Sequence, residues 1–304
     1  MVMITLRQLR YFEALSETLH FGRAARRLNI SQPALSAQIA QMEKFFGAPL
    51  FQRSSGGLTV TGEGLAIGAR VRAILTEVRE LESIATAGDA PLSRRLRLGV
   101  IASVAPYLLP SLLAVLAREH PRLECEVRES VTDRLLRELS AGEIDCAIVA
   151  LPVDEQGLET IILSEDRFHL AVPADQADRY VHHIPVAQMK DVRLILLEEG
   201  HCLRDQALEI CQISDASERA GLGATSLSTI LRMVAAGLGA TLIPDMAVPD
   251  ETRRGGIAIL PFEEPAPART IALAFRPSTA RRRDFEVLAD IIRRADQAGR
   301  QAAA

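Results

Sequence analysis

Apolar residues in the first 46 positions recur every three or four residues in three separate stretches. This spacing places the apolar side chains of each stretch on one helix face, and it predicts helices over residues 6–16, 22–28 and 32–46. Asn29 can take the left-handed backbone conformation that ends a helix. Ser31 has a side chain that caps a helix N-terminus. A short turn is therefore expected between the second and third helices.

Two helices joined by such a turn form a helix-turn-helix pattern. The start of its last helix enters the DNA major groove, where polar side chains contact base edges, while arginines of the preceding helix contact phosphates. A three-helix cluster that binds only other proteins would give the same pattern. The candidate DNA-contacting residues are Arg23, Arg26, Arg27, Ser31, Gln32, Pro33, Ser36, Gln38 and Arg53.

A short hairpin is predicted directly after the third helix. The runs 50–53 and 58–61 flank Ser54-Ser55-Gly56-Gly57, and a glycine turn of this kind joins two antiparallel strands. A hairpin in this place is the wing of a winged helix-turn-helix domain, here residues 1–61. Its presence favours the DNA-binding interpretation.

A proline-free stretch follows, from Gly62 to about Ala87. Its apolar residues are spaced alternately by four and three positions, which is the heptad pattern of a helix that pairs with another helix. They are Ile67, Val71, Ile74, Val78, Leu81 and Ala85. We predict a linker and dimerisation helix within 62–90, roughly 39 Å long, and a homodimer or homotetramer. The alternative is that this seam packs on its own domain.

Short apolar runs alternate with helical stretches from residue 91 to residue 304. This alternation is typical of a parallel sheet with helical crossovers. The expected strands lie near 96–100, 125–127, 146–149, 168–172, 194–197, 241–243 and 271–275, with helices over 107–116 and 134–139. The fold class is therefore α+β and multidomain, with a winged helix-turn-helix head, a long linker helix and an α/β regulatory domain.

Charge is unevenly distributed along the chain. The net charge is -4, yet residues 1–61 carry seven Lys or Arg and three acids, so the head is +4 and the remaining 243 residues sum to -8. A basic head on an acidic body is expected when one domain meets a polyanion such as DNA. No apolar run is long enough for a membrane span and the N-terminus does not resemble a signal peptide. We expect no membrane partner and a cytoplasmic location.

The four cysteines are too few for a disulfide scaffold. Cys125 and Cys146 lie in apolar, strand-like runs that are typical of buried thiols. Cys202 follows Gly200 at the expected start of a helix, beside basic neighbours, and such surroundings raise the thiolate fraction. The surroundings of Cys202 therefore favour a reactive thiol.

Cys202 and Cys211 are nine residues apart. In a continuous helix their Cα atoms would be separated by roughly 13 Å, whereas a disulfide allows at most about 7 Å. Peroxide would oxidise Cys202 to a sulfenic acid, and Cys211 would capture it only after the helix unwinds. The alternative is that both are ordinary, unreactive thiols.

The segment ISQPALSAQIAQMEKFFGAPLFQR, with the hairpin and the TGEG after it, resembles the N-terminal domain of LysR-type transcriptional regulators. Relatives often carry a basic residue at the wing tip, where this chain has serine and glycine. The segments GHCLRDQA, VAPYLLP, IDCAI and ATSLSTILRMVAAGLGATLIP resemble the peroxide-sensing members of that family. The resemblance implies a periplasmic-binding-protein-like regulatory domain with two lobes, 93–167 plus 270–304 and 168–269. It also implies promoter DNA and RNA polymerase as partners.

The resemblance further implies a peroxidatic role for Cys202 and a resolving role for Cys211. The residues that it places around hydrogen peroxide are Ser103, where relatives usually have threonine, Thr132, His201, Arg204 and Asp205. We predict a regulator of oxidative-stress genes that senses hydrogen peroxide through a reversible disulfide, and that is not an enzyme and uses no cofactor or metal. The nearest alternative is a LysR-type regulator whose lobes bind a small organic effector. A thiol peroxidase is a more distant one, because the chain lacks a CxxC motif.

Overall fold

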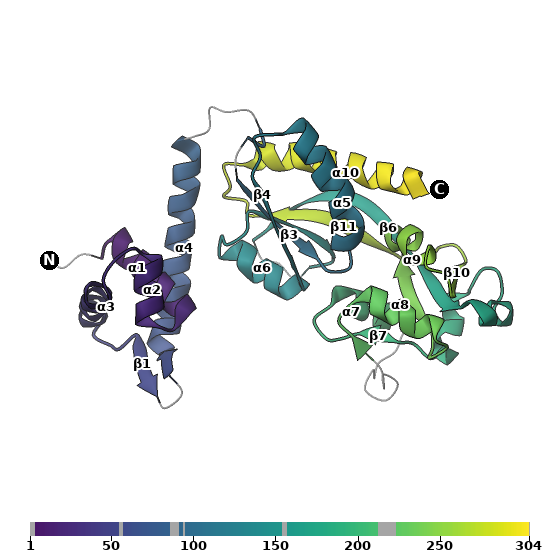
Figure 1. Cartoon of the computed structure of the whole chain (residues 1–304), viewed down its shortest axis with the longest axis horizontal. Coiled ribbons are helices and arrows are strands. Elements are labelled where there is room, and N and C mark those ends of the chain that lie inside the picture. The colour runs from purple at the N-terminus through teal and green to yellow at the C-terminus, as the bar shows by residue number, and fades with distance from the viewer. Residues whose placement is uncertain are drawn as a thin grey trace. The chain divides into compact units, whose positions relative to one another are not determined.

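The computed structural model describes residues 4–54, 57–85, 91–93, 95–153, 157–211 and 223–303, and the chain divides into two compact units, Met1–Ala87 and Gly88–Ala304 (Figure 1). The predicted wing-tip residues 55 and 56, and residues 86–90 at the end of the predicted linker, lie outside the described residues. The linker helix belongs to the first unit and not to a separate one.

The first unit begins with the predicted helices and hairpin. They are α1 (Leu6–Thr18), α2 (Phe21–Arg27), α3 (Gln32–Phe46), β1 (Phe51–Ser54) and β2 (Gly57–Val60). α1 continues two residues beyond its predicted end, to the point where Leu19 takes a left-handed conformation with a φ of 47°. Asn29 has a φ of 54°, and Ser31 Oγ accepts a hydrogen bond from Ala34 N at 3.3 Å. The turn between α2 and α3 therefore forms as its residues predict.

The linker helix α4 (Gly62–Ala85) contributes to the core of the first unit. Val71 and Leu75 are each 2% exposed and cluster with Phe12 of α1. The predicted pairing seam is therefore wrong at Val71, because a side chain buried against α1 is not free to contact a second chain. Ile74 and Leu81, further along the same seam, are 46% and 66% exposed.

A seven-stranded sheet runs through the second unit in the order β10-β6-β11-β5-β3-β4, with β9 also paired to β6. The strands are β3 (Leu96–Ile101), β4 (Cys125–Ser130), β5 (Cys146–Leu151), β6 (Glu159–Pro173), β9 (Thr241–Pro244), β10 (Ile257–Pro261) and β11 (Ala268–Phe275). β3 is parallel to β4 and β5. β11 is antiparallel to β5 and β6, and β6 is antiparallel to β9 and β10. Within this sheet, the predicted parallel arrangement is therefore correct for β3, β4 and β5 and wrong for β6, β9, β10 and β11.

Two hydrophobic cores fill the second unit. Buried residues between 92 and 163 and between 271 and 295 form the first core together with Met246, and buried residues between 168 and 262 form the second. β6 enters both cores, through Leu163 and Phe168. Because β6 and β11 lie side by side with opposite directions, the chain passes from one core to the other and returns along neighbouring strands.

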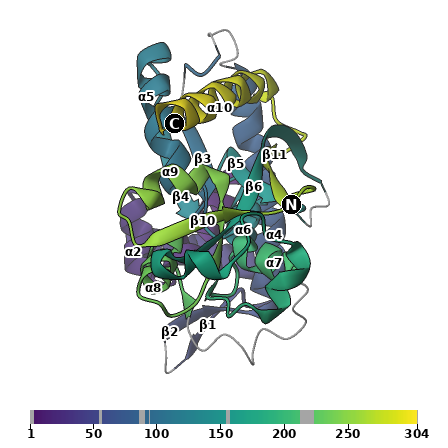
Figure 2. The same cartoon turned by 90° about the vertical axis from the view of Figure 1, so that its right-hand side faces the viewer.

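Helices and shorter elements complete the second unit. They are α5 (Ala105–Glu119), α6 (Thr132–Ser140), α7 (Cys202–Ile210), α8 (Leu227–Ala235), α9 (Val248–Thr252), α10 (Arg282–Ala303), three 3-10 helices η1 (Ala174–Arg179), η2 (Val186–Asp191) and η3 (Asp245–Ala247), and the paired strands β7 (Leu196–Leu197) and β8 (Gly223–Ala224). Figures 1 and 2 both place α5 and α10 together at one end of the unit, with α7 and α8 at the other. Within the described ranges, no helix has the length and apolar character needed to cross a membrane.

Gly64 lies where α4 passes the backbone of the wing. A Cβ atom at this position would lie 2.3 Å from the carbonyl oxygen of Leu50 and 2.7 Å from Val60 Cγ1. We expect Gly64→Ala to destabilise the first unit by about 1–3 kcal/mol, seen as a lower midpoint for that unit in calorimetry of the whole chain. Gly62→Ala is the matched control, because no described atom lies within 4 Å of its Cβ position. Equal losses in both variants would contradict a steric cause.

Candidate functional site

The start of α3 forms an open polar face. Four of the residues predicted to read bases are exposed and the fifth is half-buried at the end of the face; they are Ser31, Gln32, Pro33, Ser36 and Gln38. The opposite face of α3 packs into the core of the first unit. The helix therefore presents the predicted base-reading side chains together.

The predicted DNA-contacting arginines are all exposed, but they differ in their surroundings. Arg27 forms an ion pair with Glu17, and Arg23 donates to a carbonyl oxygen at the end of α1 at 2.8 Å. Among the residues that the structure describes, Arg26 has no ion-pair partner. Arg53 lies on β1, opposite a residue of β2. Arg26 is thus the arginine of α2 whose charge is most available to a phosphate.

The second candidate site begins at the N-terminus of α7. Gly200 has a φ of 90°, which favours glycine, and His201 has extended backbone angles as the residue before the helix. Cys202 is the first residue of α7 and is partly exposed. The glycine therefore ends the preceding extended segment and places Cys202 at a helix N-terminus, as its sequence predicts.

A small cavity lies beside Cys202, with about 10 Å³ of room for the centre of a water-sized molecule. This is roughly the space that a single water molecule needs. Its walls come from the end of β3, the start of α6 and the start of α7: Ile101, Ala102, Ser103, Ser130, Val131, Thr132, His201, Cys202 and Leu203. The fold thus brings together four of the sequence-predicted residues, Ser103, Thr132, His201 and Cys202.

The two hydroxyl groups of the cavity differ in their bonding. Ser103 Oγ accepts a hydrogen bond from Arg269 Nη1 at 2.8 Å. Thr132 Oγ1 is buried and has no hydrogen-bond partner among the described residues. A buried hydroxyl without a partner is unfavourable, so a small polar molecule in the cavity would stabilise this group.

Arg204 and Asp205 do not line the cavity. Arg204 Nη1 donates to the carbonyl oxygen of Leu197 at 3.0 Å, which ties α7 to the preceding strand. Burial raises the pKa of Asp205 above its ordinary value, while the positive charge of Arg204 opposes this rise. Arg204 therefore helps to hold the start of the helix, and neither residue touches the cavity.

A buried ion pair behind the cavity was missed by the sequence analysis. Arg269 of β11 and Asp166 of β6 are neighbours across the two strands and lie 2.9 Å apart, with no exposed side-chain surface. Arg269 also donates to Ser103 Oγ and to the Ser103 carbonyl oxygen. The only sequence signal for this pair is a charged residue just before each of the predicted strands 168–172 and 271–275, and neither charge indicates its partner.

Cys211 lies at the other end of α7 and is 2% exposed. Burial raises the pKa of its thiol to about 11. Because α7 is a continuous helix from residue 202 to residue 210, the two cysteines are separated by roughly 13 Å along its axis. Burial also raises the pKa values of Cys125 and Cys146, the latter well above its ordinary value. Cys146 lies in the first core and Cys125 packs against it.

Two family models match the chain. Residues 6–65 match "Bacterial regulatory helix-turn-helix protein, lysR family", and residues 89–297 match "LysR substrate binding domain". The chain belongs to the LysR family. This LysR-type regulator is therefore a DNA-binding transcription factor and not an enzyme.

Relatives and solved structures agree with this assignment. The regulator is 39% identical to the DNA-binding transcriptional dual regulator OxyR of Escherichia coli K12 and to the hydrogen peroxide-inducible genes activator of Dickeya chrysanthemi, over 95% of each chain. It is similar to full-length OxyR of Pseudomonas aeruginosa, with a TM-score of 0.81, 37% identity and 96% of each chain covered. It is also similar to a hydrogen peroxide-bound OxyR mutant of Corynebacterium glutamicum, with a TM-score of 0.67, 35% identity and coverage of 100% and 97%.

We expect Gln32→Ala and Arg26→Ala to weaken DNA binding in different ways. Loss of a base-reading side chain should lower discrimination between a selected duplex and a scrambled one by about 1–3 kcal/mol. Loss of a phosphate contact should weaken binding to both duplexes alike. It should also reduce the slope of log affinity against log salt concentration by about one. Fluorescence anisotropy at several salt concentrations measures both effects. Unchanged affinity in both variants would show that α3 and α2 are not the DNA-contacting helices.

We expect iodoacetamide to modify Cys202 faster than Cys211 in the reduced protein. Cys202 is partly exposed, whereas Cys211 is buried with a pKa of about 11, so only about one Cys211 thiol in a thousand is ionised at pH 8. Labelling of Cys211 should rise as the pH approaches 10, because the reactive thiolate becomes more populated. Peptide mass spectrometry at timed intervals measures both rates, and equal rates at pH 8 would contradict the assigned environments.

Proposed function

We propose that this LysR-type regulator senses hydrogen peroxide and controls oxidative-stress genes through a reversible disulfide between Cys202 and Cys211. The observation that carries the proposal is the cavity in which Cys202 lies beside the buried, unpartnered hydroxyl of Thr132. Related chains are named as hydrogen peroxide-inducible genes activators, and a similar structure is described as bound to hydrogen peroxide. Both support peroxide as the signal.

The cavity residues have complementary roles in this proposal. Ser103 and Thr132 offer hydroxyl groups to the oxygens of hydrogen peroxide, and His201 lines the cavity next to Cys202. Because Arg269 already donates to Ser103 Oγ, the serine hydroxyl proton is free to point toward the peroxide. Arg204 and Asp205 act indirectly, by fixing the N-terminus of α7.

The proposed chemistry has two steps. The Cys202 thiolate attacks one oxygen of hydrogen peroxide, the O–O bond breaks, and a sulfenic acid and a hydroxide form. The hydroxide takes up the proton that the Cys202 thiol has lost and becomes water. The Cys211 thiol then loses its proton and attacks the Cys202 sulfur, which releases a second water and forms the disulfide. One peroxide is thus reduced to two waters as two thiols are oxidised.

The second step requires a change of conformation. The roughly 13 Å between the ends of α7 exceeds the distance of about 7 Å that a disulfide allows, so α7 must unwind. Leu203, Ala207 and Cys211 belong to the second core. Bringing the two cysteines within disulfide distance therefore removes these three side chains from their present packing. Oxidation of Cys202 is thereby converted into a change in the shape of the protein surface around α7.

The assembly and the partners follow from the family and from α4. We propose that the exposed Ile74 and Leu81 contact a second chain, in a homodimer or homotetramer. The head then binds double-stranded promoter DNA in the cytoplasm, where RNA polymerase is a further partner. The proposed functional segments are the DNA-binding head (residues 1–61), the linker and dimerisation helix (62–90) and the regulatory domain (91–304). Within the regulatory domain, one proposed lobe contains residues 93–167 and 270–304, and the other contains residues 168–269.

The alternative of an organic effector finds no support at Cys202. A cavity with about 10 Å³ of room is far smaller than the several hundred Å³ of an ordinary small-molecule pocket. Hydrogen peroxide is much nearer to this size than an organic effector is, and an oxidant also explains why a thiol forms part of the cavity wall. Hydrogen peroxide is therefore the better-supported signal.

We expect near-stoichiometric hydrogen peroxide to join Cys202 to Cys211. Digestion without reductant should give a peptide pair whose mass is two hydrogens less than that of the two separate peptides, and dithiothreitol should restore them. Mass spectrometry gives the result directly. If no such cross-linked pair forms while Cys202 stays reduced, the sensor proposal is wrong.

Two serine variants separate the steps of this chemistry. Cys202→Ser should abolish oxidation and the DNA-binding response while leaving the folded structure intact. Cys211→Ser should allow the sulfenic acid, which dimedone traps, but not the disulfide. The buried Cys146→Ser is the control thiol, and loss of the response in that variant with normal folding would contradict the assignment of the pair.

A further inference from the structure

Leu92 is the first core residue of the second unit that the structure describes after the linker region. Its side chain is 1% exposed and belongs to the first hydrophobic core. Its φ is 53°, an uncommon conformation for a residue other than glycine. The Leu92 N–H donates to Asp284 Oδ1 at 3.3 Å. Packing and hydrogen bonding therefore fix the chain at the point where it enters the regulatory fold.

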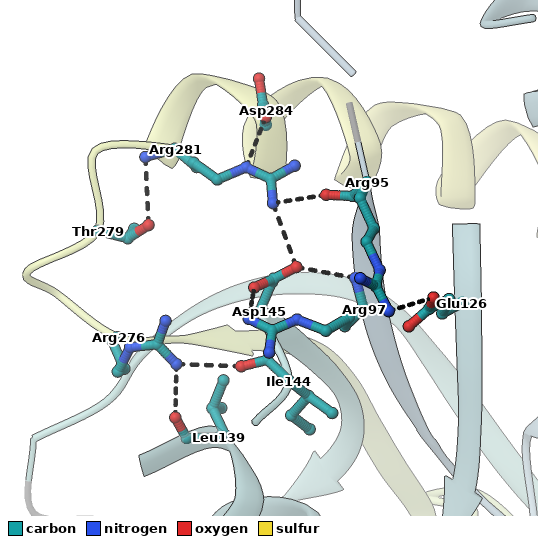
Figure 3. Close-up of polar contacts among 10 residues, drawn as sticks. All are labelled: Arg95, Arg97, Glu126, Leu139, Ile144, Asp145, Arg276, Thr279, Arg281 and Asp284. Atoms are coloured by element: carbon teal, nitrogen blue, oxygen red, sulfur yellow. Dashed lines mark hydrogen bonds and ion pairs between the residues drawn. The ribbon is translucent and has the colours of Figure 1, made fainter. Parts of the chain in front are cut away.

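Asp284 belongs to a chain of charged groups that includes Arg281, Asp145 and Arg97 (Figure 3). Arg281 Nε donates to Asp284 Oδ2 at 2.9 Å, and Arg281 Nη1 donates to Asp145 Oδ2 at 3.2 Å. The same Nη1 donates to the carbonyl oxygen of Arg95 at 3.1 Å. One guanidinium thus connects the start of α10, the start of β5 and the backbone just before β3.

Asp145 completes the connection to β3. Arg97 N donates to Asp145 Oδ2 at 2.8 Å, and Arg97 Nη2 donates to Asp145 Oδ1 at 2.6 Å (Figure 3). The side chains of Asp145 and Arg281 are only 11% and 15% exposed. Hydrogen bonds between charged groups that are partly shielded from water are stronger than neutral ones. The region where the starts of β3, β5 and α10 meet, which we call the junction, is therefore a stiff part of the fold.

β3 connects this junction to the peroxide cavity. The strand begins at Leu96, beside the charged groups, and ends at Ile101, which is a wall of the cavity. Its five steps span roughly 17 Å. A Cβ atom on Gly99, in the middle of the strand, would lie 2.7 Å from Ile144 Cδ1 and 2.9 Å from Leu135 Cδ2. Such close packing leaves β3 little room to slide independently of its neighbours.

We propose that Leu92, Arg95, Arg97, Asp145, Arg281 and Asp284 form a junction clamp that couples the redox state of the regulatory fold to the linker helix. The clamp makes Leu92, where the chain enters the regulatory fold, move together with β3, β5 and α10 as one body. A displacement of β3, β5 and α10 after α7 unwinds is then passed to the chain at Leu92, which follows the linker helix in the sequence. The inference rests on the proposed function, because that function supplies the signal.

The test compares full-length Asp284→Ala with Asp290→Ala. Asp284 contacts Leu92 N and Arg281, whereas Asp290 lies on the same helix in an exposed ion pair with Arg293 at 2.6 Å. Each variant is treated with hydrogen peroxide, and the Cys202 to Cys211 cross-link is measured by mass. Affinity for a duplex selected by the wild-type protein is then measured in the reduced and oxidised states by fluorescence anisotropy.

We expect normal disulfide formation in Asp284→Ala, with the ratio of oxidised to reduced DNA affinity shifted toward one. Asp290→Ala should keep the wild-type ratio. A wild-type ratio in Asp284→Ala, with the cross-link formed, overturns the clamp. If Asp284→Ala does not fold, the same ratio is measured in Arg281→Lys, where we expect the same shift toward one and where a wild-type ratio overturns the clamp. Lysine keeps the charge of Arg281 but does not reach both carboxylates and the Arg95 carbonyl oxygen together.

Hydrogen exchange tests the clamp without relying on the disulfide. The amides of Leu92 and Arg97 should be protected in the wild type, and this protection should fall in Asp284→Ala but not in Asp290→Ala. Exchange of both amides in the wild type at the rate of an unstructured peptide would overturn the clamp. Absence of the cross-link in the wild type would contradict the proposed function, and hydrogen exchange would then decide on the clamp alone.

Discussion

Arg269 and Asp166 form an ion pair in which neither side chain has any exposed surface. The pair joins β11 to β6 where the chain passes between the two cores, and Arg269 also holds the hydroxyl and the carbonyl oxygen of Ser103. A buried charge that loses its partner costs about 3–5 kcal/mol. The two strands and the Ser103 wall of the cavity are therefore held in one arrangement, and the surroundings of Cys202 depend on it.

The cavity walls belong to two different cores. Ser103 and Thr132 project from elements of the first core, which the buried ion pair braces. Cys202 packs against that core, but the next turns of α7, with Leu203 and Cys211, pack into the second core. The helix therefore lies across both cores, with Cys202 at the wall that contains Ser103 and Thr132. In the proposed disulfide step, unwinding of α7 would alter the packing of the second core without dismantling the cavity hydroxyls.

Local features of the fold could be predicted from the sequence, because their causes are local. Ser31 and Asn29 set the turn before α3, and Gly200 sets the start of α7, through the conformations and caps that these residue types favour. His20 was not predicted as the cap of α2, although its Nδ1 accepts from two backbone N–H groups, since histidine is an uncommon cap. The Arg269–Asp166 pair joins residues 103 positions apart, and strand direction around β11 likewise depends on long-range pairing that no local pattern contains.

Arginine serves two different purposes in this chain, and burial separates them. All but two of the 35 basic residues are arginine. In the head they are exposed, and summing charge by segment indicated a DNA-binding domain. In the acidic second unit, Arg269 and Arg276 are buried and donate to oxygens inside the fold, Arg276 Nη1 reaching the carbonyl oxygen of Ile144 at 3.0 Å. A guanidinium has five N–H donors in a plane, so one side chain can join several chain segments. Net charge counts both kinds of arginine alike and therefore does not distinguish the outward ones from those that hold the regulatory fold together.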